Sequence, residues 1–104
     1  MSRLEQIREM LADEPDDVFL NYALALELDK AGDHDASLDM FQKLAGSDSP
    51  YVPAYFMAAQ MLNRLERVDE ARKWLRDGIP IAKEQGNSHA AAEMSEFLEM
   101  ISDD

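Results

Sequence analysis

The chain has 104 residues, of which 46% are hydrophobic and 31% charged, and it contains no cysteine. This composition excludes a disordered tail, a disulfide framework and a thiolate zinc site. Four glycines and four prolines are too few for the frequent turns of a sandwich or barrel, so we expect an all-α protein with one core. The net charge of −12 opposes contact with nucleic acid or anionic lipid and favours a basic partner.

The first predicted helix covers residues 3–14, where Ile7 and Met10 form an apolar face, and Pro15 follows its end. This charged segment has no apolar centre and is not a signal peptide. No stretch of the chain approaches the roughly 18 apolar residues that cross a bilayer. We therefore expect a cytoplasmic protein that makes no contact with membranes.

A helical hairpin is predicted over residues 18–50. Its first helix, in DVFLNYALALELDKAG, carries a broad apolar stripe and ends at Gly32. The second helix begins with Asp33 as N-cap, places Phe41 on its apolar face and stops at Gly46. The alternation of apolar stripes and glycine stops predicts two antiparallel helices.

The turn AGDHDAS places His34 between Asp33 and Asp35, which are three metal-ligand residue types in a row. An N-cap and a favourable first-turn charge account for both aspartates, so the pattern favours a turn over a metal site. His89 and Glu93 share a helix face, but two ligands do not close a site. We expect neither a metal nor a cofactor.

A second hairpin is predicted over residues 52–86. Mixed charges at residues 64–76 predict a solvated helix face with salt bridges. Pro80, two residues after Gly78, predicts a kink near residues 76–80 because proline removes a helical hydrogen bond. A last helix is predicted over residues 88–102, with Asn87 or Ser88 as its N-cap.

The two hairpins repeat with a period of 34 residues. Ala25 falls on Ala59, Tyr22 on Phe56, Ser37 on Ala71 and Phe41 on Leu75, whereas Leu38 falls on Arg72, which is the mismatch. The period and the small residues resemble the tetratricopeptide repeat family, whose pattern W-x2-L-G-x2-Y, A-x3-F, P has the same length. The resemblance covers roughly residues 3–86, and Asn21 stands where the family has tryptophan.

The resemblance implies a right-handed α-solenoid of antiparallel hairpins, forming a single domain over residues 1–104. In this family the first helix of each hairpin lines a concave groove that holds a peptide or a partner helix. The implied groove residues are Phe19, Tyr22, Leu26, Asp29, Lys30, Phe56, Gln60, Asn63 and Arg64. One branch of the family binds an acidic C-terminus with Lys and Asn at these places, which Tyr22, Leu26, Phe56 and Gln60 occupy here. We therefore expect an aromatic and apolar groove with an acidic surround rather than a carboxylate clamp, which suits a hydrophobic or basic peptide or helix.

Catalytic motifs are missing from the sequence: it has no phosphate-binding glycine loop, no nucleophile elbow and no H-E-x-x-H. We expect a scaffold or adaptor rather than an enzyme. Two alternatives stay open. Tyr22 and Phe56 could pack on each other or beneath the last helix. A structural module could also self-associate through apolar ends that include Met94, Leu98 and Ile101, although the sequence does not indicate a homo-oligomer.

Overall fold

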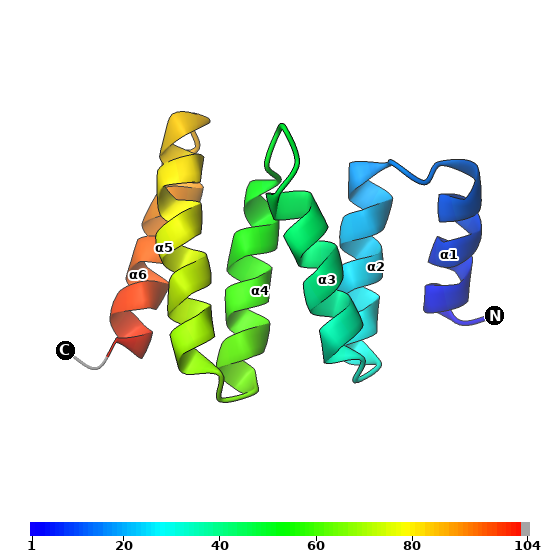
Figure 1. Cartoon of the computed structure of the whole chain (residues 1–104), viewed down its shortest axis with the longest axis horizontal. Helices are drawn as coiled ribbons and strands as arrows, with labels where there is room; N and C mark the ends of the chain where they lie inside the picture. The colour runs from blue at the N-terminus through cyan, green and yellow to red at the C-terminus, as the bar shows by residue number, and fades with distance from the viewer. Residues whose placement is uncertain (103–104) are drawn as a thin grey trace. The chain divides into compact units, whose positions relative to one another are not determined.

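The computed structural model describes residues 1–102, in which six helices and no strand are present. The predicted all-α class is confirmed. Contacts divide the chain into two compact units, Met1–Tyr51 and Val52–Asp104 (Figure 1). The single domain and the handedness of the solenoid stay predictions, and Asp103 and Asp104 lie outside the described residues.

The first unit contains three helices, α1 (Arg3–Asp13), α2 (Val18–Lys30) and α3 (His34–Ala45). The central helix α2 contacts both α1 and α3, and the two hairpin helices run antiparallel (Figure 1). The side chain of Asp17 caps α2 by accepting a 2.8 Å bond from the Leu20 amide. Asn21, at the family's tryptophan position, donates its amide to the carbonyls of Pro15 and Asp17 at 3.0 and 2.8 Å. These two hydrogen bonds join α2 to the preceding loop at the position where the family has a tryptophan side chain.

Small buried side chains let α2 and α3 approach closely. Ala25 and Ser37 are both 0% exposed, and the Ser37 hydroxyl donates a 2.6 Å hydrogen bond to the Ala25 carbonyl. Phe41 fills the same core. On α1, Ile7 is buried, but the placement of Met10 on the apolar face is wrong because Met10 is 50% exposed. The less exposed side of α1 instead runs through Leu4, Ile7 and Leu11, of which Ile7 is buried and the other two are half-buried, and helical geometry turns Met10 to its edge.

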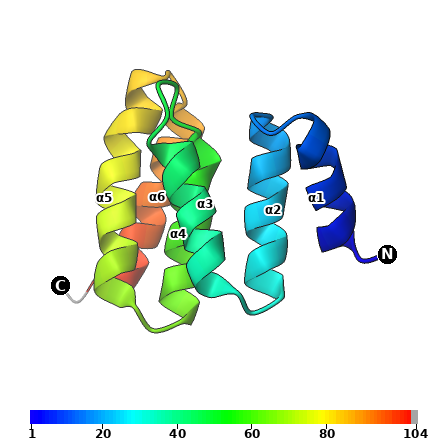
Figure 2. The same cartoon turned by 45° about the vertical axis from the view of Figure 1, so that its right-hand side comes forward.

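The second unit contains α4 (Val52–Arg64), α5 (Val68–Glu84) and α6 (Ser88–Ile101). Helix α5 contacts both of the others, and α6 also reaches α4 (Figure 2). The core consists of side chains with little or no exposure from all three helices, which are Val52, Ala54, Tyr55, Ala58, Ala59, Met61, Leu62, Ala71, Leu75, Ala82, Ala91 and Met94. The repeat residues Ala59 and Ala71 are fully buried, and the predicted Asn87 cap on α6 is present.

Helix α5 is uninterrupted through Pro80, which is exposed. The kink near residues 76–80 stays a prediction, but Gly78 has a role that the sequence did not reveal. It is buried where α5 meets both neighbours, and an added Cβ would lie 2.6 Å from the Tyr55 Cβ and 2.9 Å from the Met94 Sδ. Glycine is therefore what allows the three helices to pack this closely.

Three helix–helix turns share one geometry, the Schellman motif. Its central residue has a positive φ of 85° at Gly32, 63° at Glu66 and 74° at Gly86. The amide of the next residue then bonds back to the helix, from Asp33 to Leu28 at 2.9 Å, from Arg67 to Leu62 at 2.8 Å and from Asn87 to Ala82 at 2.8 Å. Asp33 and Asn87 also cap the following helix with their side chains, whereas Arg67 makes no such bond.

Candidate functional site

The nine predicted groove residues fall into two groups, five on α2 in the first unit and four on α4 in the second. On α2 the aromatic and apolar members recur every three or four residues and so share one helix face. Phe19 is 73% exposed, whereas Tyr22 and Leu26 are half-buried. The first turn of this face thus presents an aromatic ring to solvent.

Tyr22 is held by two other aromatic rings of the first unit. Its ring centroid lies 5.2 Å from that of Tyr51 and 6.3 Å from that of Phe41. Burial raises the pKa of the Tyr22 phenol above its ordinary value, and the neighbouring Tyr51 adds to the increase. Tyr22 is therefore a neutral, half-buried ring at neutral pH, one helical turn from the exposed Phe19.

The polar end of the α2 face is engaged within the unit. The Asp29 carboxylate lies 3.0 Å from Nδ1 of His34, and Lys30 lies 3.9 Å from Glu27, which also pairs with Arg3 at 2.8 Å. These contacts bind α2 to α1 and to the start of α3. A partner at this end would meet side chains that are already paired, whereas the end with Phe19 is open.

On α4 the aromatic member of the face is partly covered. The Phe56 ring lies edge-on to Phe97 of α6, with centroids 5.8 Å apart, and Phe56 is half-buried. This packing corresponds to the alternative in which the last helix covers Phe56. Gln60 and Asn63 are half-buried, and Arg64 is exposed. The α4 face is consequently more polar and less accessible than the first turn of α2.

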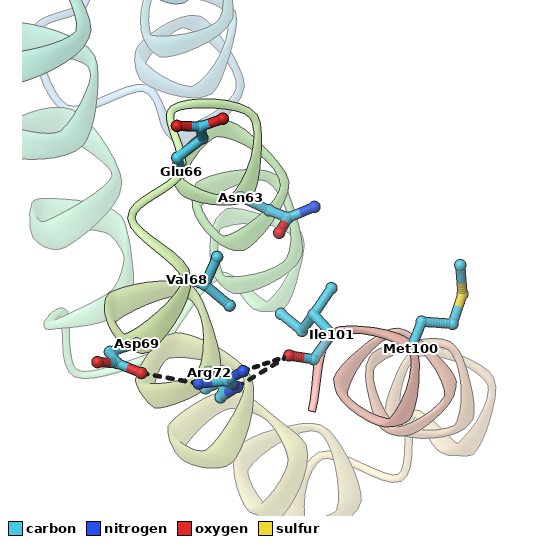
Figure 3. Close-up of a pocket in the computed structure, with 7 residues that line it drawn as sticks. All are labelled: Asn63, Glu66, Val68, Asp69, Arg72, Met100 and Ile101. Carbon is cyan, nitrogen blue, oxygen red and sulfur yellow. Dashed lines mark hydrogen bonds and ion pairs between the residues drawn. The ribbon is translucent and has the colours of Figure 1, made fainter. Parts of the chain in front are cut away.

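An open pocket of about 510 Å³ lies beside Asn63, between the start of α5 and the end of α6 (Figure 3). The Arg72 guanidinium points across it and donates to the Ile101 carbonyl at 2.9 Å from Nε and 2.6 Å from Nη2. Its Nη1 pairs with Asp69 at 2.7 Å. A cation that binds the last carbonyls of a helix satisfies them and complements the dipole, so Arg72 fastens α6 rather than offering a free charge.

Neither histidine belongs to a metal centre among the residues that the structure describes. His34 pairs with Asp29, and Nε2 of the exposed His89 lies 2.9 Å from Oε1 of Glu93, as expected for a surface pair. Within residues 1–102 no group of three or more candidate ligand side chains could hold a metal ion. The interpretation of this segment as a turn is supported, because the Asp33 side chain caps α3 by accepting a hydrogen bond from the Ala36 amide at 3.4 Å.

The predicted salt-bridged face is also present on α5. Arg67 binds Glu70 through two bonds of 3.0 and 2.7 Å, and Lys73 pairs with Asp77 at 3.0 Å. Sequence reasoning missed Phe97 and the role of Arg72. The sequence does contain one signal for Arg72, because it is a charged residue at the repeat position that leucine, Leu38, occupies in the first hairpin.

No protein-family model matches the chain, and no curated protein matches it in sequence. Similar solved structures include two of a tetratricopeptide repeat domain protein from Salinibacter ruber. The solution NMR structure is 31% identical with a TM-score of 0.78, covering 85% of this chain and 89% of that chain. The crystal structure is 30% identical with a TM-score of 0.71, covering 83% of this chain and 96% of that chain.

This identity over almost the whole of the compared chain, together with the repeat geometry, assigns the class of protein. The chain belongs to the tetratricopeptide repeat family, and the resemblance drawn from the 34-residue period is confirmed. The fold is that of a protein-interaction module in general. None of the described helices is both long and apolar enough to cross a membrane.

Proposed function

We propose that this protein is a cytoplasmic scaffold or adaptor without catalysis of its own, which binds a peptide or partner helix through the α2 and α4 faces. The observation that carries the proposal is the exposure of Phe19, at 73%, one helical turn from Tyr22. Solvated aromatic rings of this kind are enriched as anchors in interfaces. The α2 face carries the affinity, and the α4 residues Gln60, Asn63 and Arg64 supply polar contacts.

Helix-in-groove and extended-peptide binding both use apolar anchors at regular spacing. Phe19, Tyr22 and Leu26 provide such spacing on one face of α2. These apolar anchors suit a hydrophobic partner, whereas the net charge of −12 favours a basic one and disfavours nucleic acid and anionic membranes. No carboxylate clamp is proposed.

Self-association is the competing proposal, and one structural fact weakens it. Met94, one of the three side chains on which it rests, is 0% exposed and thus belongs to the core of the second unit. Leu98 and Ile101 are half-buried, and Met100 is 78% exposed on the same helix. The apolar surface that remains for a second copy is therefore smaller than the sequence suggested.

The test compares Phe19→Ser with the matched control Met10→Ser, which also removes an exposed apolar side chain from the first unit. Each protein is used to capture partners from a lysate of its source cells, and the captured proteins are identified and their binding to purified chain is measured. We expect Phe19→Ser to lose the captured partner, with Kd rising at least about fivefold, because an aromatic anchor that becomes buried on binding contributes about 1 kcal/mol or more. Met10→Ser should bind as wild type does. Equal capture by all three proteins, with unchanged circular dichroism, would refute the α2 face as the binding surface.

A further inference from the structure

An apolar surface lies next to the connection between α1 and α2, residues 14–17. Val18 is 48% exposed and Phe19 73% exposed. Val18 also lines a pocket of about 180 Å³ with Pro15, Leu44 and Tyr51. A cavity of roughly 150 Å³ holds a group the size of benzene, so this pocket is large enough for one apolar side chain.

Three carboxylates stand beside this apolar surface. Asp13 and Glu14 end α1, and Asp16 lies in the connection and lines the same pocket as Val18. All three residues are exposed, and their carboxylates form no ion pair or hydrogen bond with any part of the chain that the structure describes. Among the residues that line the pocket, one is basic, Lys43. The surface therefore carries an excess of unpaired negative charge.

The placement of two of these carboxylates opposes the stability of α1. Asp13 and Glu14 stand at the negative end of the helix dipole, and the last turn of α1 contains no basic residue to offset them. A helix gains stability from the reverse arrangement. Departures from local rules of this kind are expected where a surface serves a function. The carboxylates thus require an explanation other than folding.

We propose that this surface, the α1–α2 corner (Asp13, Glu14, Asp16, Val18 and Phe19), docks a basic segment of a partner protein. Lys or Arg side chains of the partner lie opposite the three carboxylates, and one apolar side chain of the segment enters the pocket. Phe19 adds a ring face on which a guanidinium can stack. This inference rests on the proposed function, since it names the class of partner and the end of α2 at which binding begins.

The probe is a five-residue peptide, blocked at both ends, that alternates arginine with leucine. One reference peptide has glutamine in place of arginine, and another has glycine in place of leucine. Binding to the full chain is followed by ¹H–¹⁵N NMR titration. The test variant is Asp13→Asn with Glu14→Gln and Asp16→Asn. The control variant is Asp39→Asn with Asp48→Asn and Glu84→Gln, which makes the same change in net charge at three exposed and unpaired carboxylates elsewhere.

We expect the basic peptide to shift the amide resonances of residues 13–22 and of Tyr51, and to bind more weakly as salt rises from about 0.01 M to about 1 M. The test variant should bind about tenfold more weakly, since each exposed ion pair contributes modestly and three are lost. The control variant should bind almost as wild type does. The test variant should also resist urea better than wild type, which separates a binding role from a structural one.

The proposal is overturned if the glutamine peptide binds as tightly as the basic one, or if both variants weaken binding equally and only total charge matters. It is also overturned if the glycine peptide, which has no anchor for the pocket, binds undiminished. Capture that depends on Phe19 but survives the triple substitution would leave the proposed function standing and remove this inference. Capture that survives both the Phe19 substitution and the triple substitution would remove the proposed function and, with it, this inference.

Discussion

Replacing Gly78 with alanine tests how tightly the second unit is packed. The added Cβ would lie 2.6 Å from Cβ and 2.8 Å from Cγ of Tyr55, and 2.9 Å from Sδ of Met94. Carbon atoms in contact normally stand about 3.5–4.0 Å apart, so the nearest contact is about 1 Å too short. The Met94 side chain can rotate, but the Tyr55 Cβ is fixed to the backbone of α4. Relief thus requires α4 and α5 to separate.

Two opposing effects set the size of the expected change. Alanine is favoured over glycine inside a helix by about 1 kcal/mol. Overpacking a filled core costs about 1–3 kcal/mol and occasionally more, and a clash with a backbone-linked atom belongs at the upper end. We expect Gly78→Ala to lower the free energy of unfolding by about 2 kcal/mol net. For a unit of this size the Tm would fall by about 10 °C.

Urea titration followed by the fluorescence of Trp74 measures this change. Trp74 is the one tryptophan of the chain, and its ring lies 5.7 Å from that of Tyr55. The signal therefore reports on the second unit at the site of the clash. The control is Arg76→Ala on the exposed side of α5, which should change stability by less than about 0.5 kcal/mol. A Gly78→Ala protein as stable as wild type, or more stable, would refute the close packing of α4, α5 and α6.

Two further predictions concern backbone strain and alkaline pH. Glu66 has a φ of 63° at the position equivalent to Gly32, so Glu66→Gly should raise the free energy of unfolding by about 1 kcal/mol in the same urea titration, and a loss of stability would contradict the strain. Burial raises the pKa of Tyr22 and Tyr55 in the folded protein, with smaller contributions from Tyr51 and Asp77 respectively. The stability that these phenols contribute is complete below the unfolded pKa of about 10 and is lost as pH rises through the folded value. The double substitution by phenylalanine should therefore lose less stability than wild type between about pH 10 and 12, and parallel losses in thermal melts would contradict the shift.

Local features of this fold followed from the sequence because local physics determines them. Gly32 adopts a positive φ, which costs little energy in a residue without a Cβ, and the Asp33 side chain accepts the hydrogen bond that caps the next helix. The 34-residue period located Ala25 and Ala59 at 0% exposure because small residues repeat where helices approach. The turn residues depend only on their immediate neighbours, and the repeat relates the small residues of one hairpin to those of the other.

Contacts between distant segments were not predictable in the same way. Arg72 and Ile101 are 29 residues apart, and nothing in either neighbourhood shows that a guanidinium would fasten the end of α6. The Phe56 position indicated a groove residue, but only the placement of α6 shows that Phe97 covers part of its ring. Gly78 likewise suggested a bend beside Pro80, whereas its close neighbours belong to other helices. The α2 face stays a prediction, although Phe19 does lie at the surface.

The three turns have a consequence for where the chain can be altered in length. In each turn a single residue, Asp33, Arg67 or Asn87, both closes one helix and opens the next. An inserted residue at such a turn would disrupt the packing, because it would rotate the following helix by about 100° and turn its buried stripe toward water. The segment 47–50 lies outside any helix, so none of its residues both ends one helix and begins the next. It is the natural junction at which a tag, a cleavage site or a grafted loop could enter this repeat.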